Sequence, residues 1–522
     1  MKLRLMMCFA LVMIMAGISV WAEGQQELQK KETILKIGTP NEIKSANIFS
    51  DYYLGIFAHI SNPPLMKMDE KGNLTGLTAE EFEVSEDNKI WTFIIRDNLF
   101  WSDGKKVTAE DVVFSVKYTG DHNPNARWIK DTLEKTEVLD GNRAVFHFNK
   151  PYTRLNLEFA TYNIFPEHVW KNIQDPMKYL NAGLNIGFGP FIIEKIDLDA
   201  GTVIFSQNPF WAGEKPSLDG FEIHIYKNSD ILSLALEKGD VDTYYKYASS
   251  YPYAGLQRLE KTGGFAFSET LNMGLVFLAF NLEKKPFSNP VFREAFSYII
   301  NYEELLKLDA LGYGKKPNRG FVPPSMGGYM ETQALKYDPE KALELFDKAG
   351  YTEDKRKDLT LSVLVRSDWN RVAELIQDYL SAVGIVSTVR SLDLNSWAAE
   401  KDNFNYDVTI TRTTPWGMLM HAGWGTGYYD SRRSGRGVLH SVEDPEFLNL
   451  CDIVLGTTDK NRLSELGEEV QDYYARNLPG IPLYWNTIVI PYNKDFTGWK
   501  PDPLYGIYNL DTFVTLKKKN NN

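Results

Sequence analysis

The sequence predicts an α/β fold built from more than one domain. Its 522 residues exceed what one ordinary core accommodates, so we expect two or three domains. Apolar residues make up 43% of the chain and no low-complexity block interrupts it, which is typical of a folded protein. In the C-terminal half, strand-like and helix-like segments alternate, and this order predicts parallel strands with helices packed on the sheet.

The first residues have the pattern of an export signal. Residues 1–22 combine a basic start, a short apolar run and a small residue at Ala22, and no similar run follows. We therefore expect a cleaved signal peptide, a polar linker over 23–33 and a mature chain in the periplasm. Cys8 lies early in the apolar run, in a poor context for lipid attachment, so a lipoprotein is the less favoured alternative.

Charge and cysteine content exclude several classes of function. The chain carries 57 basic and 69 acidic residues, a formal net charge of −12, which argues against nucleic acid and anionic membranes as partners. Removal of the signal would leave Cys451 as the remaining cysteine, so no intrachain disulfide is expected. A large exported protein without disulfides depends on its apolar cores for stability.

The first half of the chain carries strand signals and one well-capped helix. Strands are predicted at 34–38, 91–96 and 143–149 and, after a glycine-rich entry, within 185–196. Thr108 and Asp111 have the spacing of a capping box, which starts a helix that runs to about residue 118.

The second half alternates helices and strands. Asp338 caps a helix that Gly350 ends, and a further helix precedes Gly384. Strands are predicted at 359–365, 385–392 and 406–413. The stretch 411–437, rich in tryptophan, tyrosine, arginine and glycine, therefore leaves the carboxyl end of a strand. In open α/β sheets this edge binds ligands.

Common catalytic and metal-binding motifs are missing from the sequence. No nucleophile elbow, zinc-protease helix, Cys-x-x-Cys pair or phosphate loop occurs, and the seven histidines are scattered. The Gly-Phe-Gly-Pro run at 187–190 leads into a strand rather than a helix, which argues against phosphate binding. No carboxylate pair stands out, so we expect a protein without enzymatic activity and without a cofactor; a secreted hydrolase is the rival hypothesis.

Ordered segments along the mature chain resemble the extracytoplasmic solute-binding proteins of ABC importers, in the group that serves oligopeptides, dipeptides and nickel. The resemblance is carried by blocks at 59–118, 187–193, 208–242, 277–301 and 337–351. These blocks follow the family's order and cover essentially the whole mature chain.

The resemblance implies a two-lobed periplasmic-binding-protein fold with an insert domain in the first lobe and a ligand cleft between the lobes. Crossing segments near Leu275–Leu282 and Ile481–Asn493 are expected to form the hinge. Closure around the ligand would present a closed form to a membrane permease. The expected division is a signal peptide 1–22, a linker 23–33, a first lobe 33–76 with 187–280 and 487–517, an insert 77–186 and a second lobe 281–486.

Two subfamily patterns are only partly matched. Arg412 and Trp416 resemble a strand end of the nickel-chelate branch, and Arg127 with Trp128 resembles its carboxylate-gripping element, but Met420 replaces that branch's tyrosine. Neither of the two nearby histidines aligns with its metal-binding histidine.

In the dipeptide branch, an aspartate closely follows a tryptophan and pairs with the peptide's amino group. The glycines around Trp424 resemble the approach to it, but Asp430 comes two or three residues late. Arginines would bind a carboxylate and aromatic rings would supply rigid apolar surface. The side chains expected to line the cleft are Tyr52, Tyr53, Arg127, Trp128, Arg412, Trp416, His421, Trp424, Tyr428, Tyr429 and Asp430.

The sequence therefore predicts a ligand-capture protein of an ABC importer, with an oligopeptide or dipeptide as the favoured ligand. A nickel chelate and an oligosaccharide are the alternatives. The expected partners are the ligand and the ABC permease subunits of the inner membrane, and we expect a monomer that binds no nucleic acid.

Overall fold

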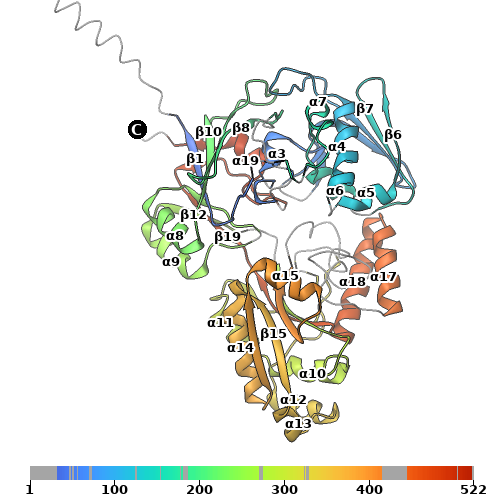
Figure 1. Cartoon of the computed structure of the whole chain (residues 1–522), viewed down its shortest axis with the longest axis vertical. Coiled ribbons are helices and arrows are strands. Elements are labelled where there is room, and N and C mark those ends of the chain that lie inside the picture. Colours follow the sequence, from blue (N-terminus) through green and yellow to red (C-terminus); the bar gives the residue numbers. More distant parts are fainter. Residues whose placement is uncertain are drawn as a thin grey trace, which may run out of the picture.

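The computed structural model describes residues 32–519 except 46, 48, 50–51, 56, 70–72, 124–125, 153–154, 177, 180–185, 248, 270–273, 323, 325–327, 414–443 and 503. This part of the chain forms two lobes, one above the other in Figure 1, with a further sheet and helices beside the upper lobe. The expected signal peptide and most of the expected linker lie outside the described residues.

The first sheet is the centre of the upper lobe. In order across the sheet its strands are β12 (Phe265–Glu269), β19 (Val489–Asn493), β11 (Thr243–Tyr244), β1 (Ile34–Thr39), β10 (Gly220–Ile225), β9 (Thr202–Gln207) and β8 (Phe191–Asp197). β1 confirms the first predicted strand and runs parallel to β10 and β11, whereas β8, β9 and β10 are antiparallel. Helices α8 (Ser229–Lys238) and α9 (Tyr253–Thr262) lie at one end of this lobe (Figure 1).

The second sheet is the centre of the lower lobe. In order its strands are β14 (Gly314–Lys315), β18 (Gly480–Asn486), β13 (Gly274–Phe280), β17 (Val408–Arg412), β15 (Thr360–Arg366) and β16 (Val386–Leu392). β15 runs parallel to β16 and to β17, which confirms the predicted parallel arrangement. β13 is antiparallel to β17 and β18. The pairing of β13 places residues 274–280 in the second sheet. The range expected for the first lobe includes these residues.

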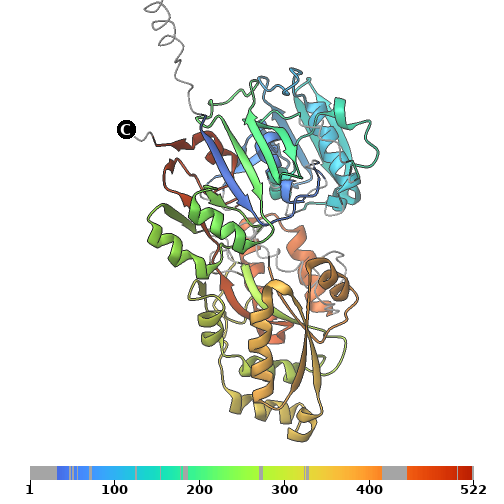
Figure 2. The same ribbon diagram turned by 60° about the vertical axis from the view of Figure 1, so that its left-hand side comes forward.

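Helices cover both faces of the second sheet. β13 is buried along its whole length, and its alternate side chains enter two different cores. One core includes residues of α10 (Pro290–Ile299), α11 (Tyr302–Leu308), α12 (Pro339–Lys348) and α14 (Asn370–Ala382). The other includes residues of α15 (Leu394–Asp402), α17 (Pro445–Gly456) and α18 (Lys460–Asn477). Figure 2 shows α14 lying along the strands.

The insert has its own antiparallel sheet and its own core. Across the sheet the order is β4 (Ala79–Val84), β5 (Ile90–Ile95), β7 (Arg143–Phe148) and β6 (Leu133–Leu139). Its helices are α4 (Ala109–His122), α5 (Arg127–Thr132), α6 (Leu155–Thr161) and α7 (Glu167–Trp170). The predicted capping box is confirmed, because the Asp111 carboxylate accepts the Thr108 N–H at 3.0 Å and Thr108 Oγ1 accepts the Asp111 N–H at 3.5 Å.

The Gly-Phe-Gly-Pro run makes a close backbone contact rather than a phosphate site. The N–H groups of Phe188 and Gly189 donate to the Ser61 carbonyl, at 2.9 and 2.8 Å, at the end of α3 (Ala58–Ser61). A Cβ on Gly189 would overlap the carbonyl oxygen of Ile60. Glycine is required here because two backbones approach too closely for a side chain.

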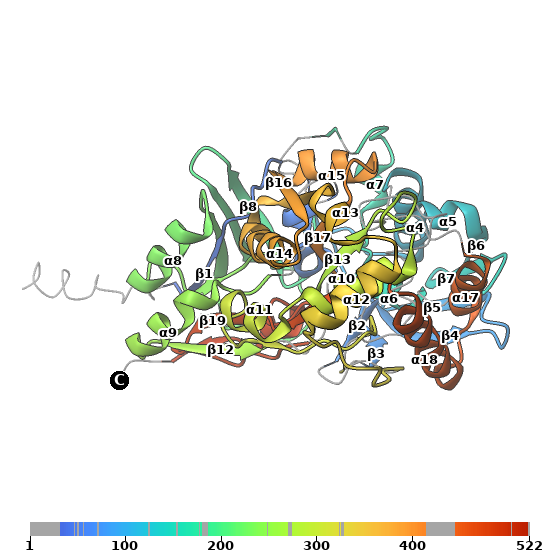
Figure 3. The ribbon, with the colours of Figure 1, turned by 90° about the horizontal axis from the view of Figure 1, so that it is seen from below.

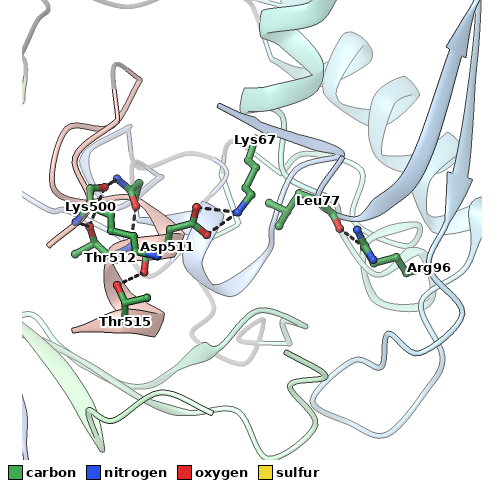
Figure 4. Close-up of polar contacts among 8 residues, drawn as sticks. Lys67, Leu77, Arg96, Lys500, Asp511, Thr512 and Thr515 are labelled. Carbon is green, nitrogen blue, oxygen red and sulfur yellow. Dashed lines mark hydrogen bonds and ion pairs between the residues drawn. The ribbon is translucent and has the colours of Figure 1, made fainter. Parts of the chain in front are cut away.

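The C-terminal segment returns to the upper lobe. It forms β20 (Phe496–Thr497), α19 (Leu510–Thr515) and β21 (Lys517–Lys518), and it contacts the hairpin of β2 (Met66–Met68) and β3 (Leu74–Gly76). Lys67 Nζ lies 2.7 Å from both carboxylate oxygens of Asp511 (Figure 4). Thr512 Oγ1 accepts the Lys500 N–H at 3.0 Å, so the tail is held to itself as well as to the hairpin.

Candidate functional site

The chain passes between the first and the second sheet twice. One passage lies between Glu269, the end of β12, and Gly274, the start of β13; the other joins β18 to β19 through Thr487 and Ile488. β12 pairs with β19 and β13 pairs with β18, so the described ends of the two passages lie side by side. We call these strand ends, together with Thr487 and Ile488, the crossing strip. The covalent connections between the two sheets run through this strip.

Arg412, the last residue of β17, connects the two lobes next to the crossing strip. Its Nη2 donates to the carbonyl of Tyr247 at 3.3 Å and to Ser249 Oγ at 3.0 Å. Both acceptors belong to the upper lobe, where they follow β11, so a side chain of the lower lobe is bonded to the upper one. A guanidinium has five N–H donors in one plane, a geometry that also matches a carboxylate.

Thr413 fixes the point at which the chain leaves β17. Its N–H donates to the Leu275 carbonyl at 2.9 Å, and its Oγ1 accepts the Leu275 N–H at 2.9 Å. The residue is almost fully buried. Thr413 is therefore held beside the start of β13, at the boundary between the lobes. The described chain resumes at Asp444, whose carboxylate caps α17 through the Glu446 N–H at 2.9 Å.

Residues 247–253, described except for 248, run along the upper side of this boundary. The Tyr247 N–H donates to Asn41 Oδ1 at 2.9 Å, which holds the segment to the end of β1. Ser250 Oγ donates to the Val489 carbonyl at 3.1 Å and accepts its N–H at 3.0 Å. The Tyr253 hydroxyl donates to the Thr487 carbonyl at 2.5 Å. The segment is thus bonded to the crossing strip as well as to Arg412.

Buried hydroxyl and carboxyl groups continue the network below the strip. The Tyr484 hydroxyl donates to Asp309, and Tyr253 also donates to Asn486. Burial raises the pKa of both tyrosine hydroxyls above an ordinary value that already keeps them protonated at neutral pH. Burial also raises the pKa of Asp309, although the hydrogen bond from Tyr484 acts in the opposite direction.

In the insert, the predicted Trp128 is held by its neighbours. Its ring stacks on Tyr152 with a centroid separation of 4.5 Å and an interplanar angle of 13°, and its Nε1 donates to the Tyr162 hydroxyl at 3.3 Å. The half-buried ring packs against the insert core. Arg127 starts α5, but its side chain is not among the described ones. Ligand contact by this pair stays a prediction.

Most of the other predicted site residues lie outside the described part of the chain. Tyr52 and Tyr53 begin α2 (Tyr52–Gly55), of which the backbone is described and these two side chains are not. The predicted residues within the stretch 414–443, which is not described, are Trp416, His421, Trp424, Tyr428, Tyr429 and Asp430. Their expected contacts with ligand stay predictions.

The structure adds residues that the sequence analysis does not single out. Tyr247, Ser249 and Tyr253 meet the lower lobe or the crossing strip, although they lie more than 150 positions before Arg412. The available signal was local: KYASSYPY at 246–253 places tyrosines and serines just after a buried strand and up to the first residue of α9.

The described residues include neither a membrane-spanning helix nor a cluster of metal ligands. Within these ranges no helix combines the length and the apolar character needed to span a bilayer. The same residues contain no group of three or more histidine, cysteine, aspartate or glutamate side chains that could hold a metal ion.

Comparison with known proteins shows which proteins are similar to this chain in sequence and in fold. The sequence profile of the bacterial extracellular solute-binding proteins, family 5, matches residues 73–435. The glutathione-binding protein GsiB of Salmonella paratyphi A is 24% identical over 514 residues, which cover 93% of this chain and 95% of the relative.

Solved structures share the fold over nearly the whole chain. The periplasmic binding protein DppA of Helicobacter pylori, in complex with the peptide STSA, superposes with a TM-score of 0.78 at 20% identity and covers 94% of this chain and 99% of its own. NikZ of Campylobacter jejuni, in complex with Ni(L-His), has a TM-score of 0.76 at 20% identity and covers 93% and 99%. The predicted two-lobed α/β fold is confirmed. The chain belongs to the bacterial extracellular solute-binding proteins, family 5.

Proposed function

We propose that this protein captures a short peptide between its two lobes and delivers it to an ABC permease. The observation that carries the proposal is the position of Arg412, whose planar guanidinium lies at the boundary of the lobes beside the crossing strip. A peptide's terminal carboxylate is a natural partner for such a donor set. The relatives named for glutathione, itself a small peptide with free carboxylates, support the same ligand chemistry.

The capture mechanism follows from the arrangement of the sheets. The proposed lobes are the ranges of the sequence analysis, except that residues 274–280 belong to the lower lobe, and the insert at 77–186 moves as part of the upper lobe. A ligand that contacts both lobes binds the closed arrangement better and shifts the population toward it. Arg412 would supply charge from the lower lobe, while Arg127, Trp128, Tyr52 and Tyr53 would approach from the upper lobe.

The 414–443 stretch would supply the apolar wall. We propose that Trp416, Trp424, Tyr428 and Tyr429 contact the ligand and that Asp430 pairs with its amino group. Thr413 supports this assignment, because its bonds to Leu275 start the stretch at the boundary between the lobes.

The proposed setting is the periplasm, after removal of residues 1–22, with the protein acting as a monomer that binds without turnover. A nickel chelate is the second candidate, since Arg412 would bind the carboxylates of a chelator equally well. His421 would then be tested as a metal ligand.

Native mass spectrometry of protein isolated from its own host tests the ligand class directly. Co-purified peptides support the proposal, and a bound nickel chelate or oligosaccharide mass replaces it with the corresponding alternative. The identified ligand is then incubated with the protein. Its consumption over time would identify an enzyme instead of a binding protein.

Arg412 variants test the proposed carboxylate contact. Arg412→Met should weaken peptide binding by about tenfold or more, because a charge-assisted hydrogen bond is lost. Arg390→Met is the matched control, since Arg390 lies on β16 and bonds Asn405 and Glu400 within the lower lobe. Equal affinities of the two variants in calorimetry would remove Arg412 from the site.

A further inference from the structure

A groove of about 580 Å³ opens between the lobes beside α9 and α11. Its upper wall is the α9 face with Tyr253, Ala254 and Gln257, and its lower wall is formed by α11 and by residues 311–316. Because one wall belongs to each lobe, the width of the groove depends on the angle between the lobes.

The crossing strip separates this groove from Arg412. In the second sheet, β18 and β13 carry the two passages and lie between β14 and β17. Tyr313 and Lys316, which flank β14, line the groove, whereas Arg412 ends β17. The views of Figures 1 and 3 agree: α8, α9 and α11 gather toward one end of the molecule, and α17 and α18 lie at the other.

The floor of the groove rests on the strip itself. The rings of Tyr253 and Tyr313 stack with a centroid separation of 5.0 Å and an interplanar angle of 12°, one ring from each lobe. The Thr487 N–H of the strip donates to the Tyr313 carbonyl at 3.3 Å. These contacts lie at the crossing strip, so a rotation about the strip would leave them in place while the outer groove widens or narrows.

The ion pair on the lower wall does not tie the walls together. Lys316 Nζ lies 2.5 Å from Glu303 Oε1, and both residues belong to the lower lobe. The groove can therefore widen without separating this pair.

We propose that this groove, here called the rear groove, controls the closure of the lobes. The crossing strip acts as the fulcrum of a lever, so rotation that brings the Arg412 side together opens the rear groove. Bulk placed in the rear groove consequently favours the closed arrangement and raises solute affinity without touching the solute. The expected effect on solute affinity rests on the proposed function. The expected link between the rear groove and the angle between the lobes does not.

The test places a large side chain on the upper wall and measures the angle between the lobes without any solute. Ala254 is exposed on α9, and Ala254→Trp directs bulk into the rear groove. Ala382→Trp is the matched control, since Ala382 is exposed at the end of α14 and does not line the rear groove. Spin labels at Asp131→Cys on α5 and Glu468→Cys on α18 report the distance across the opposite end, because Cys451 is buried.

Double electron–electron resonance should show a shorter distance between the two spin labels in Ala254→Trp than in the parent and in Ala382→Trp. An unchanged or longer distance overturns the inference. If Ala254→Trp fails to fold, Gln257→Trp on the same wall takes its place, with the same criterion.

Solute affinity gives the second readout, with a synthetic tripeptide as the probe. A shift of the closed fraction from about 5% to about 50% corresponds to about tenfold tighter binding. A shorter label distance without any peptide binding would uphold the lever and refute the proposed function. Peptide binding that is unaffected by a shortened label distance would refute the control of affinity by the rear groove.

Discussion

We expect Asp502 to make the stability of the upper lobe depend on pH. It lies in the C-terminal segment beside a small pocket that His59, Tyr505 and Asp511 also line. Burial raises its pKa from 3.8 to about 7, and the negative charge of Asp511 adds to this rise. Hydrogen bonds from the N–H groups of Leu504 and Tyr505 act in the opposite direction.

The sign and size of the effect follow from linkage. A carboxyl group whose folded pKa is raised binds its proton more tightly in the folded chain, so stability is lost as the pH rises from about 4 through about 7. At about 1.4 kcal/mol for each pKa unit, the shift of Asp502 corresponds to an upper limit of about 4.5 kcal/mol. The residue is half-buried, so solvent screening reduces the expected change to about 2 kcal/mol.

Asp502→Asn removes the titration but keeps an oxygen for the two N–H groups. We expect the variant to exceed the parent in free energy of unfolding by about 2 kcal/mol more at pH 8 than at pH 4.5. Urea unfolding at both pH values measures this, with Asp199→Asn, an exposed carboxylate in a turn, as the control. A difference between Asp502→Asn and the parent that is the same at both pH values would refute the reasoning.

Three other changes give separate tests. Gly189→Ala should destabilise the upper lobe by more than about 2 kcal/mol in urea unfolding, because its Cβ meets a backbone carbonyl. Gly264→Ala should not, because a Cβ at Gly264 would make only an ordinary contact, 3.7 Å from Thr262 Oγ1. Lys67→Met should change the free energy of unfolding by less than about 1 kcal/mol, since the ion pair of Lys67 with Asp511 is partly exposed. Because Asp511 would lose its positive partner, the pKa of Asp502 should rise, as measured by NMR titration. Trp416→Ala should weaken ligand binding by about tenfold or more and leave the melting temperature of the empty protein unchanged; a markedly lower melting temperature would show that the ring belongs to a core.

Local sequence patterns predicted much of the fold. Helix caps and strands depend on neighbours within a few positions of the chain. The structure confirms the predicted capping box at Thr108, the cap at Asp338 and the strands of the second half. The antiparallel position of β13 could not be predicted this way. A strand that is buried on both faces shows no alternation, and its partners in the sheet come from distant parts of the chain.

The candidate site likewise combines a residue that the sequence predicted with residues that only the structure reveals. Sequence likeness singled out Arg412 as a ligand-binding residue, which stays a prediction, and the structure shows its guanidinium bonded to Tyr247 and Ser249 of the other lobe. These two acceptors follow no spacing rule, since they reach Arg412 only because the chain crosses between two sheets. The sequence by itself determined the family, the capped helices and the parallel strands, because these depend on local periodicity and ordered motifs. Only the tertiary structure decided which residues meet across the crossing strip, because contacts between lobes are set by how the two sheets are joined.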